Sequence, residues 1–317
     1  MTTTPLPRRS MIIASMAALA ATSCTSLPLK SKPKLKLSLA QFSLHRGFRG
    51  KNGYKKIDSL DFPKITRNLG IDGVEYVASF FPNREPDLKY TKEMLQRSKD
   101  HAVVNQLIMV DRKGDLGDPN KTQRKIAVDN HMKWVEAAAL LGCHSIRVNA
   151  RSAGTPAEQV KLMADGLHSL CEQSEKYNMN ILMENHGGLS SDGEWLSAVV
   201  KATQHPACGT LPDFGNFWDR ETETLYDPYK GIKAMLPHAK ALSAKAFDLV
   251  PGKKYDMLNQ KFNFEINFER MMNMSFDSGY KGYIGIEYEG ANPEKDETIG
   301  ILRTKEMIET LWNQYYS

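Results

Sequence analysis

Four short apolar segments in the second half of the sequence are each followed at once by polar or ionisable side chains. A charged side chain beside an apolar segment is costly to bury unless it is paired, hydrated or bound to a metal. A single carboxylate in such a place often caps a helix or forms a salt bridge, but four successive segments with this pattern favour a shared site. The segments are followed by Glu184, Asn185 and His186; by Asp213 and Asn216; by Lys245 and Asp248; and by Glu287 and Glu289.

These residue types suit the movement of a proton on a carbon next to a carbonyl group. That reaction needs a base, an acid and a positive centre for the developing oxyanion. Because alternate side chains of a strand face the same side, we expect Glu184 to lie on the same side as His186, and Glu287 on the same side as Glu289.

The elements that must position these residues alternate along the chain. Strands begin roughly 30 to 40 residues apart, which is the size of a βα unit. The clearest helical patterns are 123–141, 156–177 and 192–203, and a last helix is expected at about 296–312. The pattern predicts a single-domain α/β protein, a (β/α)8 TIM barrel over residues 37–317. A doubly wound open sheet is the alternative, but no G-x-G-x-x-G follows the first strand. The predicted strands are 37–41, 73–76, 103–109, 145–148, 180–183, 209–211, 241–244 and 283–286.

The first 24 residues have the pattern of an export signal. Arg8 and Arg9 precede an apolar run, Met11–Ala21, that is too short to span a bilayer. Ala21–Cys24 resembles the lipobox of bacterial lipoproteins, and the arginine pair resembles a twin-arginine signal; an ordinary secretory signal is the alternative. Residues 25–36 form a basic tether. We therefore expect an exported protein, in the periplasm or as a cell-envelope lipoprotein, whose contact with a membrane is a lipid on Cys24.

The charge of the remaining chain gives no reason to expect a nucleic-acid partner. Six of the 42 basic residues and none of the 37 acidic residues lie in residues 1–36, so residues 37–317 carry a net charge of −1. Cys143, Cys171 and Cys208 are far apart and lack a C-x-x-C spacing, which predicts buried free thiols rather than disulfides or a zinc site.

The sequence resembles the xylose-isomerase-like barrel superfamily, in its sugar phosphate isomerase/epimerase group, over nearly all of residues 37–317. In that family a Glu, an Asp, a His and a Glu after strands five to eight bind one divalent cation. The resemblance implies Glu184, Asp213 and Glu287 as ligands of Mn, Mg, Co or Zn, with the two glutamates also moving the proton. Asn216 falls where many members have a substrate-binding His. The resemblance is clearest in Glu184–Gly188, Asp213–Asn216 and Ile286–Glu289.

Lys245 departs from the family's pattern. The His-x-x-Asp of the family aligns with Lys245-Ala-Phe-Asp248, and a protonated lysine among carboxylates cannot coordinate a metal. Two accounts stay open: His186 is a substitute ligand from strand five, or Lys245 itself stabilises the oxyanion without a metal. A shift of one residue would instead point Lys245 away from the site.

The predicted function is therefore a sugar isomerase or epimerase that acts by metal-assisted proton transfer on a carbohydrate, for which a keto-sugar is one candidate. The alternatives are a hydrolase or lyase of 3-keto-glycosides at the same site, and a non-catalytic sugar-binding lipoprotein. A DNA-repair endonuclease of this fold would need more histidines and a basic groove. The oligomeric state stays open. The predicted substrate-binding residues are His186, Asn216, Asn149, Arg151 and Glu289, and weaker candidates are Gln41, His45, Glu75, Phe80, Phe81, Trp195 and Trp218.

Overall fold

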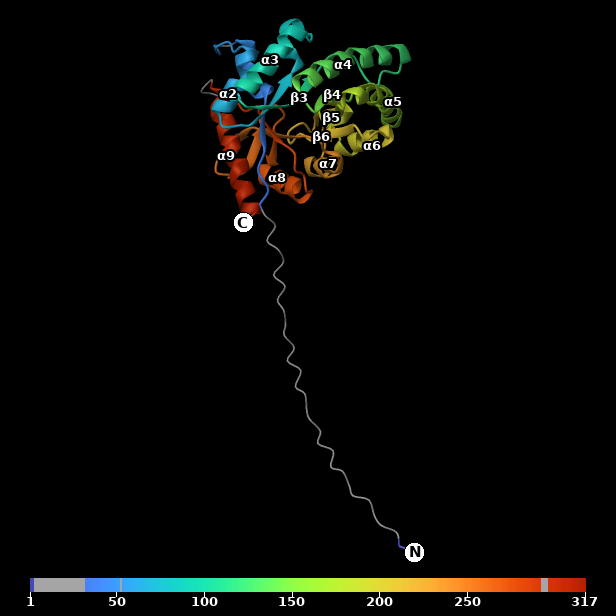
Figure 1. The fold of residues 1–317 in the computed structure, drawn as a ribbon, viewed down its shortest axis with the longest axis vertical. Coiled ribbons are helices and arrows are strands. Elements are labelled where there is room, and N and C mark those ends of the chain that lie inside the picture. Colours follow the sequence, from blue (N-terminus) through green and yellow to red (C-terminus); the bar gives the residue numbers. More distant parts are fainter. Residues whose placement is uncertain (3–31, 52, 292–295) are drawn as a thin grey trace. The chain divides into compact units, whose positions relative to one another are not determined.

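Eight parallel strands form a ring in the computed structural model (Figure 1). Neighbouring strands pair in the order β6-β5-β4-β3-β2-β1-β13-β9, and parallel bridges from Thr210 to Ala239 and from Asp213 to Ser243 close the ring between β6 and β9. The predicted (β/α)8 barrel and its eight strands are confirmed. The strands are β1 (Leu37–Ala40), β2 (Gly73–Val77), β3 (Val104–Val110), β4 (Ser145–Asn149), β5 (Asn180–Glu184), β6 (Cys208–Leu211), β9 (Leu242–Ala246) and β13 (Ile284–Tyr288).

Helices surround the ring of strands (Figure 1). Their buried apolar side chains belong to the same core as those of the strands, as expected for helices with an apolar stripe. The four helices predicted from periodicity are present, with ends within three residues of the predicted ones. The helices are α1 (His45–Arg49), α2 (Phe62–Asn68), α3 (Leu88–Asp100), α4 (Lys121–Leu141), α5 (Pro156–Ser174), α6 (Gly193–Thr203), α7 (Pro228–Met235), α8 (Phe268–Asp277) and α9 (Glu297–Tyr315).

Local sequence signals fix where the long helices begin and end. The Asn120 side chain accepts hydrogen bonds from the first backbone N–H groups of α4, and the left-handed Gly142, with φ 77°, ends this helix. Thr155 and Glu158 form a reciprocal capping box at the start of α5, where Pro156 takes the first position.

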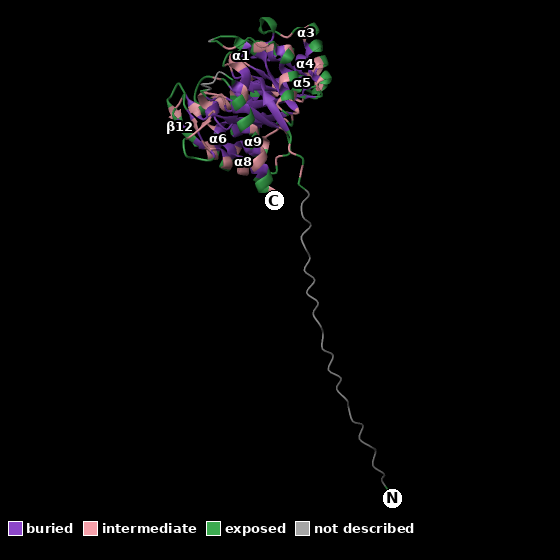
Figure 2. Cartoon of the chain, turned by 90° about the vertical axis from the view of Figure 1, so that its left-hand side faces the viewer, coloured by how far each residue is buried: buried purple, intermediate pink, exposed green. Residues whose placement is uncertain are grey.

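The strands are buried on both faces, as the purple centre of Figure 2 shows. Their outward side chains pack against the helices, and a smaller apolar cluster that includes Val77, Leu107 and Leu182 lies apart from that core. Buried polar and charged side chains also come from the strands, among them Glu75, Arg147 and Lys245. The barrel thus combines an apolar shell with buried polar and charged side chains that the strands contribute to its interior.

Two small antiparallel sheets follow the barrel strands β6 and β9, and the sequence did not predict them. A hairpin pairs β7 (Trp218–Asp219) with β8 (Thr224–Leu225). A three-stranded sheet is formed by β10 (Asp248–Leu249), β11 (Asp256–Asn259) and β12 (Phe264–Asn267). Strands of two to four residues carry too little periodicity to be identified from sequence.

The structure describes residues 1–2, 32–51, 53–291 and 296–317. The barrel belongs to one compact unit, Lys34–Ser317. Arg8, Arg9, Cys24 and most of the predicted tether lie outside the described residues. In the described part of the chain, no helix combines the length and apolar character needed to cross a membrane. Cys143, Cys171 and Cys208 are buried free thiols, as predicted.

Candidate active site

Three buried carboxylates converge at the ends of neighbouring strands. Glu184 ends β5, Asp213 follows β6 and Glu287 belongs to β13. One oxygen of each lies within 4.8 Å of one oxygen of the other two, and the residues are between 0% and 5% exposed. Burial raises the pKa of each carboxyl to about 7. The structure thus brings together the three residues that the resemblance implies as ligands.

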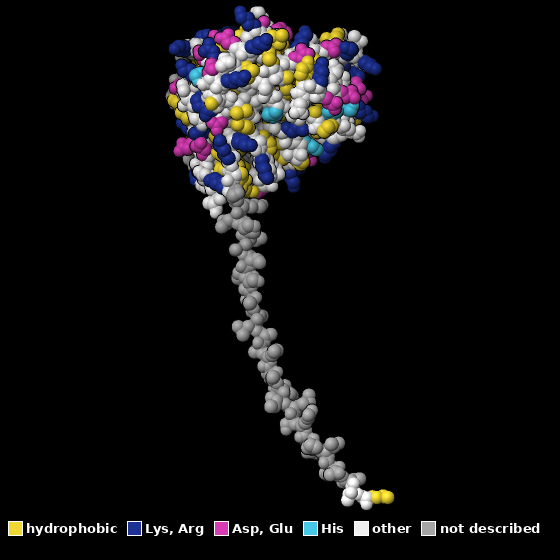
Figure 3. Space-filling view, in the orientation of Figure 1, with side chains coloured by type: hydrophobic (Ala, Val, Ile, Leu, Met, Phe, Trp, Pro, Cys, Tyr) yellow, Lys and Arg dark blue, Asp and Glu magenta, His cyan; other side chains and the backbone are white. Residues whose placement is uncertain are grey.

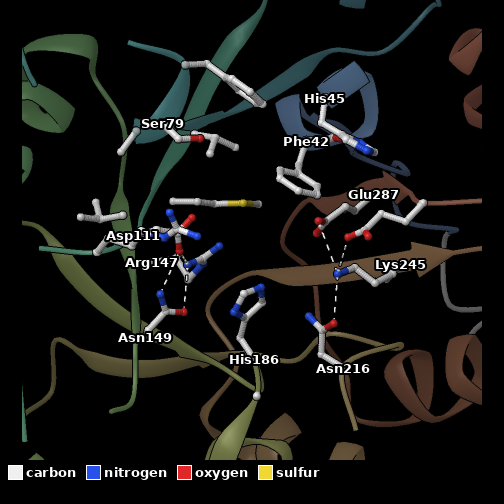
Figure 4. Close-up of a pocket in the computed structure, with 18 of the residues that line it drawn as sticks. Phe42, His45, Ser79, Asp111, Arg147, Asn149, His186, Asn216, Lys245 and Glu287 are labelled. Carbon is white, nitrogen blue, oxygen red and sulfur yellow. Dashed lines mark hydrogen bonds and ion pairs between the residues drawn. The ribbon is translucent and has the colours of Figure 1, made fainter. Parts of the chain in front are cut away.

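Lys245 points into this group rather than away from it. Its Nζ lies 3.5 Å from Glu287 Oε1 and 3.7 Å from Asp213 Oδ2, and it donates a hydrogen bond of 3.2 Å to Asn216 Oδ1 (Figure 4). Burial alone would lower the pKa of Lys245, but Asp213, Glu287 and Glu289 hold it well above its usual range. The site therefore contains a permanent ammonium group.

Glu289 is the nearest carboxylate to that ammonium. Its Oε1 lies 3.0 Å from Lys245 Nζ. Although burial favours the neutral form, Lys245 lowers the pKa of Glu289 to about 2. Glu287 and Glu289 both contact Lys245, so the two glutamates lie on the same side of their strand, as the period of two predicts.

The hydroxyl of Ser243 links two of the three carboxylates. Its Oγ lies 2.7 Å from Asp213 Oδ2 and 3.2 Å from Glu287 Oε2. A hydroxyl has one proton to donate, so when it donates to Asp213 it can accept from a protonated Glu287. Sequence reasoning missed Ser243, although it lies two residues before Lys245 on the same strand and hence on the same side.

Arg147 neutralises the other side of the site. Its Nε lies 2.7 Å from Glu184 Oε2, and its Nη1 lies 2.6 Å from Asp111 Oδ1. Burial works against the charge of Asp111, but Arg147 keeps the pKa of this carboxyl well below its usual range. Arg147 and Asp111 were not predicted. The available signals were an arginine inside the apolar strand Ser145–Asn149 and an aspartate directly after β3.

His186 lies between the Arg147 and Lys245 groups (Figure 4). Burial, with Arg147 and Lys245 next in effect, lowers its pKa to about 3, so the ring is neutral. Its Nδ1 is buried and has no hydrogen-bond partner among the described residues. His186 does not belong to the group of ligand atoms that lie within 4.8 Å of one another. A neutral imidazole in this place can bind a substrate hydroxyl or carbonyl.

The remaining predicted residues divide between the cavity wall and the core. Asn149 donates to Asp111 and accepts from Arg147, and the exposed Arg151 lines the same cavity. The cavity above the carboxylates has a volume of about 2380 Å³. His45, Phe80, Phe81 and Trp218 also line it. The other three predicted residues form hydrogen bonds in the core: Gln41 donates to Ser59, Glu75 accepts from Ser38, and Trp195 donates to the Pro156 carbonyl.

The donor set of Glu184, Asp213 and Glu287 fits a divalent cation. Carboxylate oxygens are the ligands that Mg²⁺ and Mn²⁺ prefer. Burial is the largest cause of the raised pKa of all three carboxyls, and Lys245 acts against it in each case. A bound dication would add positive charge beside these buried carboxyls, while the Lys245 ammonium competes for the same oxygens.

Comparisons with known proteins agree with this fold. The model of the family described as xylose isomerase-like TIM barrel matches residues 63–306, while no curated protein matches the sequence. The structure is similar to that of 3-keto-D-glucoside 4-epimerase YcjR from E. coli, with a TM-score of 0.64 and 13% identity over 87% of this chain and 100% of that chain.

Two further solved structures show the same fold. D-Psicose 3-epimerase from Clostridium cellulolyticum H10, crystallised with D-tagatose, has a TM-score of 0.65 and 12% identity over 88% of this chain and 99% of that chain. A xylose isomerase-like TIM barrel protein from Mycobacterium smegmatis, in complex with magnesium, has a TM-score of 0.61 and 14% identity over 90% of this chain and 98% of that chain.

Proposed function

Because the chain belongs to the xylose isomerase-like TIM barrel family, we propose that the protein is a sugar isomerase or epimerase. In this proposal it moves a proton on a carbon next to the carbonyl group of a carbohydrate. Glu184 and Glu287 are the acid and the base, Lys245 is the resident cation, and His186, Asn216, Asn149, Arg151 and Glu289 bind the substrate.

The observation that carries the proposal is the pair of buried glutamates beside a fixed positive charge. Glu184 and Glu287 come from different strands and both have a pKa raised to about 7. At neutral pH each can take up or release a proton, which is the property that general acid–base catalysis requires. The ammonium of Lys245, 3.5 Å from Glu287, can stabilise negative charge that develops on the carbonyl oxygen.

Glu184, Asp213 and Glu287 would hold a divalent cation, which when bound would polarise the carbonyl group. The residues of the chain account for the other requirements. Arg147 fixes the orientation of Glu184 through the contact of 2.7 Å, and Ser243 joins Asp213 to Glu287. His186 offers its unpartnered Nδ1 to a sugar oxygen.

Similar structures favour a keto-sugar as the substrate, since they include a 3-keto-D-glucoside 4-epimerase and D-psicose 3-epimerases. The volume of the cavity favours a second candidate, the cleavage of 3-keto-glycosides. About 2380 Å³ exceeds the range of roughly 300–1,000 Å³ that is common for small-molecule sites, so an aglycone has room beside the reacting ring. Release of an aglycone would distinguish this reaction from epimerisation.

The test is the exchange of substrate hydrogen with solvent. The purified protein is incubated in D₂O with D-fructose, D-psicose or methyl 3-keto-glucoside, and NMR follows deuterium uptake and product formation. We expect Glu184→Gln and Glu287→Gln each to reduce exchange by about 10²- to 10⁴-fold, because each removes an acid–base group. Glu265→Gln on the exposed side of β12 is the matched control. An absence of exchange in the wild-type protein, with and without Mn²⁺ or Mg²⁺, would refute the proposed function.

Metal content is a separate measurement on the same proteins. We expect about one divalent ion per chain after incubation with Mn²⁺, Mg²⁺, Co²⁺ or Zn²⁺, and loss of that ion in Glu184→Gln, because the triad supplies three carboxylate ligands. If the wild-type protein exchanges substrate hydrogen but binds none of these ions, stabilisation of the oxyanion would be assigned to Lys245 alone.

A further inference from the structure

The mouth of the cavity is much more basic than the rest of the barrel. Residues 37–317 carry a net charge of −1, and Lys, Arg, Asp and Glu side chains are intermixed over the face drawn in Figure 3. The described lining above the floor contains ten Lys and Arg but five Asp and Glu residues. An excess of one sign of charge around a cavity attracts ligands of the opposite sign. The floor residues left out of this comparison are Asp111, Arg147, Lys245, Glu287 and Glu289.

Two of these cations lie together on one aromatic ring. The guanidinium carbon of Arg220 is 4.9 Å from the centre of the Phe262 ring, and Lys261 Nζ is 5.2 Å from the same centre. Trp218 stacks on Phe262 with ring centres 5.9 Å apart. The hairpin β7–β8 and the turn between β11 and β12 bring these four residues to the cavity wall.

Neither cation has a carboxylate partner within the part of the chain that the structure describes. The nearby Asp219 is buried, and its oxygens accept from the Glu221 backbone and the Thr222 hydroxyl. Burial, with Arg220 next in effect, lowers the pKa of Lys261, whereas Glu289 raises it. The positive charges of Arg220 and Lys261 therefore repel each other, and an anion bound between the two side chains would relieve that repulsion.

The pair is close to the proposed reaction centre. The charges of Glu289 and Lys245 both act on Lys261, and Glu289 is 3.0 Å from Lys245. Arg220 and Lys261 line the same cavity as Glu287 and Glu289, so a ligand that reaches the carboxylates at one end can extend toward the two cations at the other. The aromatic surface of Trp218 and Phe262 suits the apolar face of a sugar ring.

We propose that the substrate is an anionic carbohydrate whose carboxylate, sulfate or phosphate is bound between Arg220 and Lys261. This inference rests on the proposed function for the carbohydrate part of the ligand, and it adds the charge of that ligand. The residues of the floor act on the carbonyl end of the sugar, and Arg220 and Lys261 on the cavity wall bind its anionic end.

The experiment compares sugars that differ in one group. Isothermal titration calorimetry measures Kd for D-fructose, D-fructuronate, D-fructose 6-sulfate and D-fructose 6-phosphate at 50 mM and 500 mM NaCl. We expect at least one anionic sugar to bind about 10-fold or more tightly than D-fructose, with a preference that falls at high salt. The anion with the lowest Kd identifies the source of the charge.

A double variant tests the two residues. Arg220→Gln/Lys261→Gln is expected to reduce the preference for the anion to about 1-fold and to leave the Kd of D-fructose unchanged. Lys201→Gln/Lys233→Gln removes the same charge from α6 and α7, outside the cavity, and is expected to keep the preference. Both pairs are exposed, so the folded state is retained.

Equal affinity for neutral and anionic sugars, no binding of any of them, or a preference that survives in Arg220→Gln/Lys261→Gln would overturn the inference. The deuterium exchange described above decides the proposed function independently. A protein that exchanges hydrogen on neutral keto-sugars without any preference for anions would retain the function and lose the anionic substrate.

Discussion

At the scale of single residues, Lys245 stands where the resemblance leads one to expect a histidine ligand. Its ammonium lies within 3.7 Å of both Asp213 and Glu287. A histidine there would offer a neutral nitrogen, whereas the ammonium offers a fixed charge and no lone pair. The identity of this one residue would therefore set how strongly the triad could hold a divalent ion.

Replacement of Lys245 by His is expected to strengthen metal binding. The substitution removes the competing ammonium and adds a nitrogen ligand, so we expect the Kd for Mn²⁺ to fall by about 10-fold or more. Isothermal titration calorimetry with Mn²⁺ measures the change. Lys233→His, on the exposed side of α7, is the control and should leave the Kd unaltered. Weaker Mn²⁺ binding in Lys245→His would show that the ammonium does not compete with the ion.

At the scale of elements, α5 packs so closely against the segment after β3 that there is no room for an added side-chain atom at the contact. A Cβ added at Gly166 would collide with the carbonyl oxygen of Leu116. Because both groups belong to the backbone, neither can move without shifting an element. The glycine thus sets how closely α5 approaches that segment, despite the low helix propensity of glycine.

Gly166→Ala is expected to destabilise the protein by about 1 to 3 kcal/mol, as overpacking in a filled core does. The gain in helix propensity from alanine, about 1 kcal/mol, acts in the opposite direction. Chemical denaturation monitored by circular dichroism measures the difference. Lys161→Ala on the exposed face of α5 should change stability by less than about 0.5 kcal/mol. A Gly166→Ala protein as stable as the wild type would mean that α5 can move.

The helix α4 contains a buried histidine whose charge state makes folding depend on pH. Burial lowers the pKa of His131 to about 4 from its usual 6.5, and its Nδ1 hydrogen bonds with the Ala127 carbonyl. The unfolded chain therefore binds a proton at His131 between about pH 6.5 and pH 4, and the folded chain does not. This residue supports stability above pH 6.5, and its contribution is lost as the pH falls through that window.

His131→Gln is expected to reduce the loss of stability between pH 7.5 and pH 5 by about 2 kcal/mol. Because buried carboxyls titrate in the same window with the opposite sign, the comparison is between the variant and the wild type at each pH. Denaturation curves at both pH values give the four free energies of unfolding. His101→Gln, at the end of α3, controls for the loss of a histidine. An unchanged pH dependence in His131→Gln would contradict a neutral buried ring.

At the scale of the whole molecule, we propose that the barrel is exported and held at the cell envelope by a lipid on Cys24. Cys24 lies in the segment before the described residues, and the proposal rests on the pattern of the first 24 residues. The proposed binding of free or glycosidic sugars agrees with this location, because such sugars occur outside the cell membrane.

Cys24→Ser is expected to move the protein from the membrane fraction to the soluble fraction of a bacterial host, since the serine cannot carry the lipid. Immunoblots of the separated fractions, together with labelling by a fatty-acid analogue, measure the change. Thr25→Ala, at the next position, should leave both results as in the wild type. A wild-type protein found in the soluble fraction without a lipid would favour the ordinary secretory signal.

The sequence by itself determined the barrel and most of the residues of the candidate site. Apolar strands followed by Glu184, Asp213 and Glu287 identify both the fold and the end of the barrel that carries the site, because parallel strands of a barrel end together. The period of two also placed Glu287 and Glu289 on one side. Each of these signals involves residues that are close together in the sequence, so a single sequence is enough to detect it.

Only the tertiary structure decided how the charges are paired. It showed Lys245 inside the site, joined Arg147 to Glu184 and Asp111, and placed Ser243 between two carboxylates. It also brought Arg220 and Lys261 onto one ring from two short sheets that carry too little periodicity to be predicted. Such pairs join segments far apart in sequence, and the distance between their charges, which sets each pKa, exists only after the chain has folded.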